Sequence, residues 1–135
     1  MKKYQILEHT ADLKIKAFGK TKKELFLNVF LGMIESQKPE TKGNQEIKRE
    51  IKIKSLDLEA LLVDFLSEAL YLTQVNRETY DNVKFKKFTD TEIEGELIGK
   101  KVERFGEDIK GVTYHDLDVH QREDRVWEAT ILFDI

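Results

Sequence analysis

The sequence contains no cysteine, and this absence excludes disulfide bonds, thiolate zinc sites and a cysteine nucleophile. It also lacks any apolar run that approaches the roughly 18 residues of a membrane span. The first residues, Met1–Glu8, become charged again too soon to provide the apolar stretch of a signal peptide. We therefore expect a cytoplasmic protein that does not associate with a membrane.

Neither sign of charge dominates the sequence. The chain has 23 Lys and Arg against 26 Asp and Glu, a net charge of -3. This charge argues against a protein whose main role is to bind the phosphate backbone of a nucleic acid. The charges are unevenly distributed, because residues 14–54 hold 11 basic and 5 acidic side chains whereas residues 55–135 hold 10 and 19. The basic segment 14–54 is either a contact surface for a polyanion or simply a solvated face.

The first half of the chain has the patterns of a strand followed by a helix. Its 135 residues, 40% of them apolar, suit one core, so we expect a single domain over residues 1–135. Leu13–Phe18 alternates with period two, as in a half-buried strand. Thr21 and Glu24 have the spacing of a capping box, which predicts a helix that begins there. Ser36–Asn44 then predicts a loop, because it includes Pro39 and Gly43.

The remaining sequence predicts a second strand and helix and then strands alone. The strand ends at Lys54, and Asp57 is a suitable N-cap for a helix that reaches about Gln74. Four β-prone runs follow: Val83–Phe88, Thr91–Val102, Val112–Val119 and Val126–Ile135. We predict an α+β domain of order βαβα followed by a mostly antiparallel strand meander, with two helices packed on one face of the sheet.

Carboxylates near the two ends of the chain are candidates for a metal site. Asp12 belongs to a polar cluster, Glu8–Asp12, at the turn into the first predicted strand, and Asp134 precedes Ile135 at the end of the last one. The Asp134 side chain and the Ile135 α-carboxylate repel each other unless a cation or hydrogen-bond donors lie between them. If Asp12 joins them, the all-oxygen set suits Ca²⁺ or Mg²⁺ rather than zinc. The alternative is that Thr and Asp in this cluster only close a turn.

A second polar cluster, Gly111–Val119, lies in a predicted strand. In a regular strand Tyr114 and Asp116 point to one face and Thr113 and His115 to the other, so His115 and Asp116 share a face only if the strand has a bulge. The sequence has no recognisable serine nucleophile elbow, P-loop or dinucleotide-binding glycine pattern. A small metal-dependent phosphoester hydrolase that uses Asp12, Asp134 and His115 remains the enzymatic alternative.

Four motifs together resemble those of the archease family. They are the runs 9–12 (HTAD), 58–66 (LEALLVDFL), 112–117 (VTYHDL) and 133–135 (FDI). The resemblance covers nearly the whole chain. It implies a small metal-binding cytoplasmic protein that activates an RtcB-type RNA ligase by promoting its guanylylation and multiple turnover in tRNA splicing and RNA repair. It further implies that Asp12, Asp134 and Ile135 bind calcium, with His9 and His115 as supporting candidates and with no catalytic residue.

Segment 98–110 departs from the family pattern, because many members carry a longer loop with a basic and histidine-containing stretch at this place. The resemblance therefore implies no particular role for this segment. The resemblance implies a non-enzymatic activator that meets RNA only through the ligase complex. A passive RNA or protein adaptor that uses the basic segment is a third hypothesis, and the acidic net charge argues against it.

Overall fold

The computed structural model describes residues 1–8 and 12–135 of the chain. Residues 9–11 lie outside the described residues. Within the described residues ten elements follow one another along the chain, two helices and eight strands, and the strands pair antiparallel throughout. The predicted α+β class is therefore confirmed.

The first sheet joins the two ends of the chain. Its strands lie in the order β1-β2-β8-β7, with bounds β1 (Tyr4–Glu8), β2 (Asp12–Gly19), β8 (Trp127–Asp134) and β7 (Gly111–Gln121). On β2 the alternation anticipated from the sequence is present, because Ile15 and Ala17 are buried while Lys14 and Lys16 are only partly buried on the other face. The last strand of the chain is thus central in this sheet, between β2 and β7.

The second sheet is built around the long strand β6 (Glu92–Phe105). One side of β6 pairs with β4 (Ile47–Lys54) and, near its end, with β3 (Pro39–Thr41); the other side pairs with β5 (Glu78–Phe88). Two differences from the sequence analysis are found here. The segment predicted as a loop, 36–44, contains the short strand β3, and β6 continues to Phe105, beyond the predicted end of this β-prone run at Val102.

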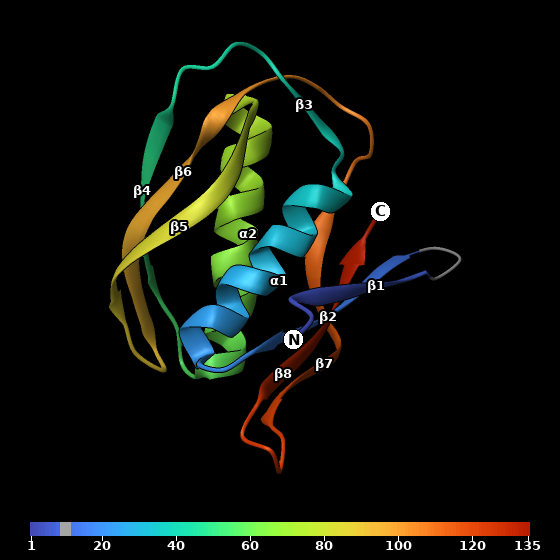
Figure 1. Cartoon of the computed structure of the whole chain (residues 1–135), viewed down its shortest axis with the longest axis vertical. Helices are drawn as coiled ribbons and strands as arrows, with labels where there is room; N and C mark the ends of the chain where they lie inside the picture. Colours follow the sequence, from blue (N-terminus) through green and yellow to red (C-terminus); the bar gives the residue numbers. More distant parts are fainter. Residues whose placement is uncertain (9–11) are drawn as a thin grey trace.

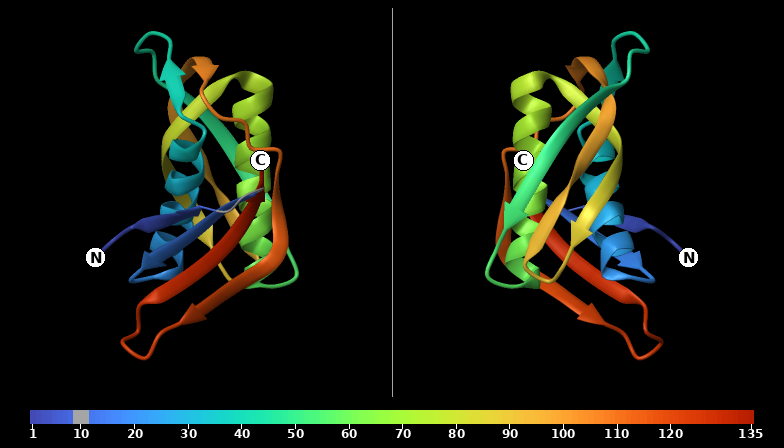
Figure 2. Two further views of the ribbon diagram at one scale, coloured as in Figure 1. Left: turned by 90° about the vertical axis from the view of Figure 1, so that its right-hand side faces the viewer. Right: turned by 90° about the vertical axis from the view of Figure 1, so that its left-hand side faces the viewer.

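The two helices lie between the two sheets (Figure 1). Helix α1 (Lys22–Ser36) packs on β2 and also contacts β5, whereas α2 (Leu58–Asn76) packs on β7 and contacts β4, β5 and β6. The predicted meander is therefore divided, because the β5–β6 hairpin belongs to one sheet and the β7–β8 hairpin to the other. Figure 2 shows the β7–β8 hairpin extending past the ends of both helices.

Local sequence signals fix where the helices begin. The Thr21 hydroxyl accepts a hydrogen bond from the Glu24 amide at 3.1 Å, and the Asp57 carboxylate accepts one from the Ala60 amide at 2.8 Å, as the spacing predicted. In a capping box the Glu24 carboxylate accepts a hydrogen bond from the Thr21 amide. Here it accepts one from the amide of the preceding residue, Lys20, at 3.2 Å. Neither helix is both long and apolar enough to cross a membrane, within the described residues.

One ion pair joins β4 and β5, the strands on the two sides of β6 in the second sheet. The Glu78 side chain is fully buried at the start of β5, and its carboxylate accepts two hydrogen bonds from Arg49, at 2.9 and 2.6 Å. The Tyr80 hydroxyl donates to the same carboxylate at 2.7 Å. Hydrogen bonds from Arg49 keep the pKa of Glu78 below its ordinary value, and burial raises the pKa of Tyr80.

Candidate functional site

The pairing of β2 with β8 brings together the two aspartates that the sequence analysis selected. Asp12 is the first residue of β2 and lies directly opposite Asp134, the last residue of β8. Residues opposite each other in an antiparallel pair place their side chains on the same face, with Cβ atoms about 4.5–5.5 Å apart. Two carboxylates therefore face one side of the sheet where its two central strands end, and they come from opposite ends of the chain.

The strand end at Asp134 is held from the other side by the connection between β6 and β7. Asp134 also lies opposite Gly111, the first residue of β7, and its carbonyl oxygen accepts a hydrogen bond from the Lys110 amide at 2.7 Å. The Gln74 side-chain amide of α2 donates to the carbonyl oxygen of Ile109 at 2.6 Å. These bonds fix the position of the last residues against α2.

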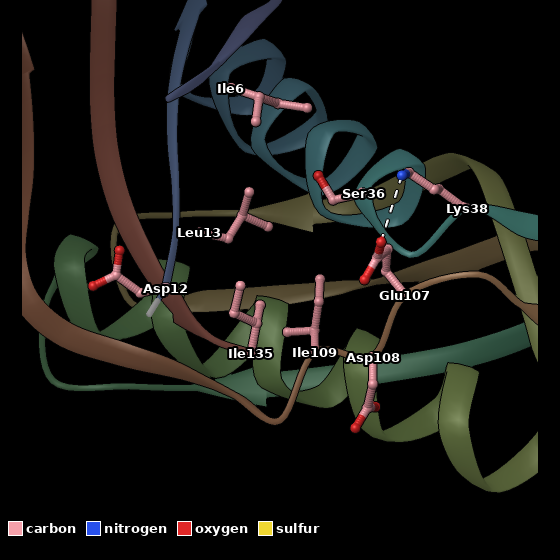
Figure 3. Close-up of a pocket in the computed structure, with 9 residues that line it drawn as sticks. All are labelled: Ile6, Asp12, Leu13, Ser36, Lys38, Glu107, Asp108, Ile109 and Ile135. Carbon is pink, nitrogen blue, oxygen red and sulfur yellow. Dashed lines mark ion pairs between the residues drawn. The ribbon is translucent and has the colours of Figure 1, made fainter. Parts of the chain in front are cut away.

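A pocket of about 350 Å³ lies beside this strand end (Figure 3). Its lining comes from β1, β2, the end of α1, the β6–β7 connection and the end of the chain: Ile6, Asp12, Leu13, Ser36, Lys38, Glu107, Asp108, Ile109 and Ile135. Lys38 and Glu107 form an ion pair of 3.5 Å across one side of it. Sequence reasoning missed this pocket, because its walls come from five separate segments that only the tertiary fold brings together.

The carboxylates at the strand end are of the donor type that hard divalent cations prefer. Asp12 and Asp134 are cross-strand neighbours, and Asp12 and Ile135 line the same pocket. Carboxylate oxygens are the ligands that Ca²⁺ and Mg²⁺ prefer, and like charges this close repel without a cation or donors. Among the described residues no three His, Cys, Asp or Glu side chains form a group able to hold a metal ion. A site here thus needs a donor beyond the side chains of Asp12 and Asp134, and the α-carboxylate of Ile135 is the one that the sequence analysis selected.

Of the two histidine candidates, the structure describes one. His9 lies outside the described residues. His115 lies in β7, where the register against β8 shifts between Thr113 and Asp118, and Asp116 adopts a left-handed φ of 57°. This bulge brings the His115 ring and the Asp116 carboxylate to 3.6 Å, the arrangement that a regular strand forbids.

Tyr114 lies within this bulge, and its strand β7 packs against α2. The pKa of Tyr114 is raised, first by partial burial and then by the negative charges of Asp64 and Asp57 on α2. Both His115 and Asp116 are exposed. The structure therefore brings Asp12 and Asp134 together and places His115 in a separate cluster on the next strand.

A third histidine forms a polar cluster that the sequence pattern did not reveal. His120 of β7 contacts Asp118 on its own strand at 2.7 Å and Glu128 of β8 at 3.3 Å. Only the strand register could show this contact, since Glu128 lies directly opposite His120.

Comparisons with known proteins agree with the motifs. The sequence model of the Archease protein family (MTH1598/TM1083) matches residues 4–135. The chain belongs to the archease family. The protein archease of Methanosarcina acetivorans is 42% identical over 147 residues, which cover 99% of this chain and 97% of that protein. The protein archease of Pyrococcus furiosus is 30% identical over the full length of both chains, 142 aligned residues.

Solved structures in this family share the fold. The solution structure of Methanobacterium thermoautotrophicum protein 1598 covers 100% of both chains with a TM-score of 0.71 and 24% identity. The crystal structure of an archease described as a possible chaperone, TM1083 from Thermotoga maritima, covers 96% of this chain and 94% of its own, with a TM-score of 0.69 and 20% identity. At these identities the likeness concerns the fold alone.

Proposed function

We propose that this archease is a non-enzymatic cytoplasmic activator of an RtcB-type RNA ligase, which promotes guanylylation and turnover of the ligase in tRNA splicing and RNA repair. Membership in the archease family supports a role as an activator. The observation on which the proposal rests is the cross-strand pair Asp12 and Asp134, because two carboxylates on one face of paired strands form a place where a cation can be held.

In this proposal Asp12, Asp134 and the α-carboxylate of Ile135 hold Ca²⁺, with Mg²⁺ or another hard divalent cation as the alternative. When bound, the ion would supply concentrated positive charge beside the ends of β2 and β8, suited to meeting anionic groups of a partner or its nucleotide. The protein residues supply oxygen donors on two paired strands, so the spacing of the donors is set by the backbone register. Charge neutralisation removes the repulsion between the aspartates and couples ion binding to stability.

RNA reaches this protein only through the ligase complex in our proposal. A net charge of -3 gives little attraction for a phosphate backbone at physiological salt.

The test is a ligase assay with isosteric variants. Asp12→Asn and Asp134→Asn should each reduce stimulation of guanylate transfer from GTP by about tenfold or more, which corresponds to roughly 1.4 kcal/mol. Circular dichroism should show an unchanged fold. Asp81→Asn is the matched control, because Asp81 is an exposed aspartate on β5 in the other sheet.

Two results would contradict the proposal. Folded Asp12→Asn and Asp134→Asn proteins that stimulate the ligase as well as the parent would show that the pair is not needed. Metal-dependent turnover of a phosphoester by the isolated protein would favour the hydrolase with Asp12, Asp134 and His115. The position of His115 in the β7 bulge, paired with Asp116, gives that alternative no added support.

A further inference from the structure

The large apolar side chains that the fold leaves exposed are concentrated on and around α2. Among the described residues, four such side chains lie away from the two ends of the chain, and each is more than half exposed: Leu56, Tyr71, Val75 and Tyr114. Leu56 precedes α2, and Tyr71 and Val75 lie on it. Tyr114 lies on β7, which runs beside α2 (Figure 2). Exposed apolar side chains that gather in one region are a common feature of protein contact sites.

Two of these side chains belong to a straight stripe on the solvent side of α2. The stripe follows intervals of four, three and four residues and consists of Asp64, Glu68, Tyr71 and Val75. This is the spacing with which one helix presents a side to a second helix. The opposite side of α2 is buried, and it includes Leu62, Leu66, Ala69 and Thr73. A side of a helix that faces solvent is normally polar, so Tyr71 and Val75 are unusual at these positions.

The N-terminal half of the stripe is acidic. Helix α2 contains no lysine or arginine. Asp64 accepts a hydrogen bond from the neutral Ser55 hydroxyl at 2.6 Å, which leaves its negative charge in place. Two lysines of β4 line a hollow beside Asp64 and Glu68, but they pair with glutamates of β6: Lys52 and Lys54. Within the described part of the chain, neither Asp64 nor Glu68 is in an ion pair.

Strand β7 borders the stripe and has the same character. It also contains no lysine or arginine, and Asp116 is exposed on it. Partial burial and then the negative charges of Asp64 and Asp57 raise the pKa of Tyr114, so this ring lies near the acidic half of the stripe. The surface therefore combines exposed aromatic and aliphatic groups with carboxylates that lack a paired cation.

We propose that this stripe, with Tyr114 beside it, binds an amphipathic helix of a partner protein that presents aliphatic residues in one half and lysine or arginine in the other. The aliphatic half covers Tyr71 and Val75 and removes them from water. The cations meet Asp64 and Glu68. Carboxylates without paired cations would repel RNA or an anionic lipid surface, so the charge selects a basic protein segment as the occupant. This inference stands on α2 and β7 alone and does not depend on the ligase role.

The experiment uses the full chain and three helical peptides of about 18 residues, roughly 27 Å long, observed by NMR amide shifts. On one side the first peptide has leucine in one half and lysine in the other, at the spacing of the stripe. The second peptide has glutamine in place of leucine, and the third has glutamate in place of lysine. We expect the first peptide to shift the amides of residues 64–75 and of Tyr114. We expect the other two to bind about tenfold more weakly or not at all.

Paired variants separate the stripe from other exposed apolar side chains. Tyr71→Gln and Val75→Gln should each weaken binding of the first peptide about tenfold, because glutamine keeps the helix propensity but loses the apolar contact. Circular dichroism should show an unchanged fold. Ile6→Gln is the matched control, because Ile6 is an exposed aliphatic residue on β1, and this change should leave the affinity as it is.

A second pair of variants tests the charge. Glu68→Gln should weaken the first peptide about threefold at low salt, and the difference from the parent should shrink as salt is added. Glu59→Gln removes an equal charge from α2 and should have little effect. Glu59 is exposed and lies on the opposite side of the helix, since nine residues span two and a half turns.

Three outcomes would overturn the inference: equal affinity for the leucine and glutamine peptides, amide shifts that lie away from α2 and β7, or unchanged binding by folded Tyr71→Gln and Val75→Gln. Sedimentation tests a second copy of this chain as the occupant. A dimer that Tyr71→Gln converts into a monomer would also overturn the inference, because the stripe would then be covered by a second copy and not by a partner protein.

Discussion

At the residue scale, the Glu78 carboxylate is the side chain whose protonation we expect to influence stability most. It is fully buried, and Arg49 and Tyr80 donate to it. Removal of one partner from a buried charged pair leaves the other incompletely satisfied, which costs more than the pair itself contributes. Arg49 keeps part of its side chain in solvent, which reduces this cost.

We predict that Glu78→Gln lowers the free energy of unfolding by about 1–3 kcal/mol, measured by urea denaturation at neutral pH. Glu40→Gln is the control, because it removes a carboxylate from an exposed pair with Arg104 on the same sheet and should change stability little. If both variants lose the same free energy of unfolding, the burial of Glu78 does not determine its contribution to stability.

The lowered pKa of Glu78 sets the direction of the pH dependence. Since its pKa is lower in the folded state than in the unfolded chain, the stability from ionised Glu78 is present above the ordinary carboxyl range. This stability is lost as the pH falls from the unfolded pKa through the lowered folded pKa. Urea denaturation across that acidic range should therefore show a steeper loss for the parent than for Glu78→Gln.

The α-carboxylate of Ile135 gives a second prediction at the residue scale. Calcium at about 100 times its dissociation constant should stabilise the protein by about 2.7 kcal/mol, which is several degrees in melting temperature. Residues appended after Ile135 remove the α-carboxylate from this position, so they should weaken calcium binding in calorimetry. An Ile135→Ala protein keeps the carboxylate and is the matched control. Unchanged affinity in the extended chain would exclude Ile135 as an anionic ligand.

At the scale of elements, strand β6 depends on glycines that oppose irregularities in β5. The register between these strands shifts between Tyr80 and Asn82 and again between Phe85 and Lys87. Next to these shifts, a Cβ atom on Gly99 would overlap the Thr79 carbonyl, and one on Gly95 would overlap the Lys84 carbonyl. The bulges of one strand therefore require residues without side chains on its neighbour.

We predict that Gly99→Ala lowers the free energy of unfolding by about 1–3 kcal/mol or more, because backbone atoms of β5 must move. Gly111→Ala on β7 should have a much smaller effect, since a Cβ there has no atom within 4 Å. Thermal denaturation of both variants measures the difference. If the two variants have the same melting temperature, the backbone of β5 can move with little loss of stability.

At the scale of the whole molecule, the basic segment 14–54 divides into separate groups. Lys14 and Lys16 lie on the same face of β2 as Asp12, which follows from the alternation of the strand. Lys22, the first residue of α1, contacts Asp90 at 2.7 Å and lies 5.1 Å from the centre of the Trp127 ring. In the other sheet Lys52 and Lys54 pair with glutamates of β6.

We predict that a Lys14→Gln, Lys16→Gln protein associates more weakly with the ligase at low salt, and that the difference from the parent shrinks as salt is added. Lys52→Gln, Lys54→Gln in the other sheet is the control with equal charge change. Association rates over a salt series provide the measurement. Equal rates for both double variants at every salt concentration would assign Lys14 and Lys16 to solvation alone.

The sequence by itself determined the features that depend on local spacing. Thr21 and Asp57 mark the two helix starts because capping needs only residues three apart, and the alternation around Ile15 marks a strand because side chains change face at every residue. The four motifs identified the family, which the match over residues 4–135 confirms. The carboxylates of Asp12 and Asp134 were also selected from the sequence, although their metal stays a prediction.

Only the tertiary structure decided how these pieces are combined. Period-two patterns identify strands but not their partners, so the division into two sheets with the helices between them depended on long-range pairing. The same reason applies to the bulge that joins His115 to Asp116, and to the pocket between Ile6 and Ile109. Register and packing bring together residues that are distant in sequence, and no local spacing encodes such contacts.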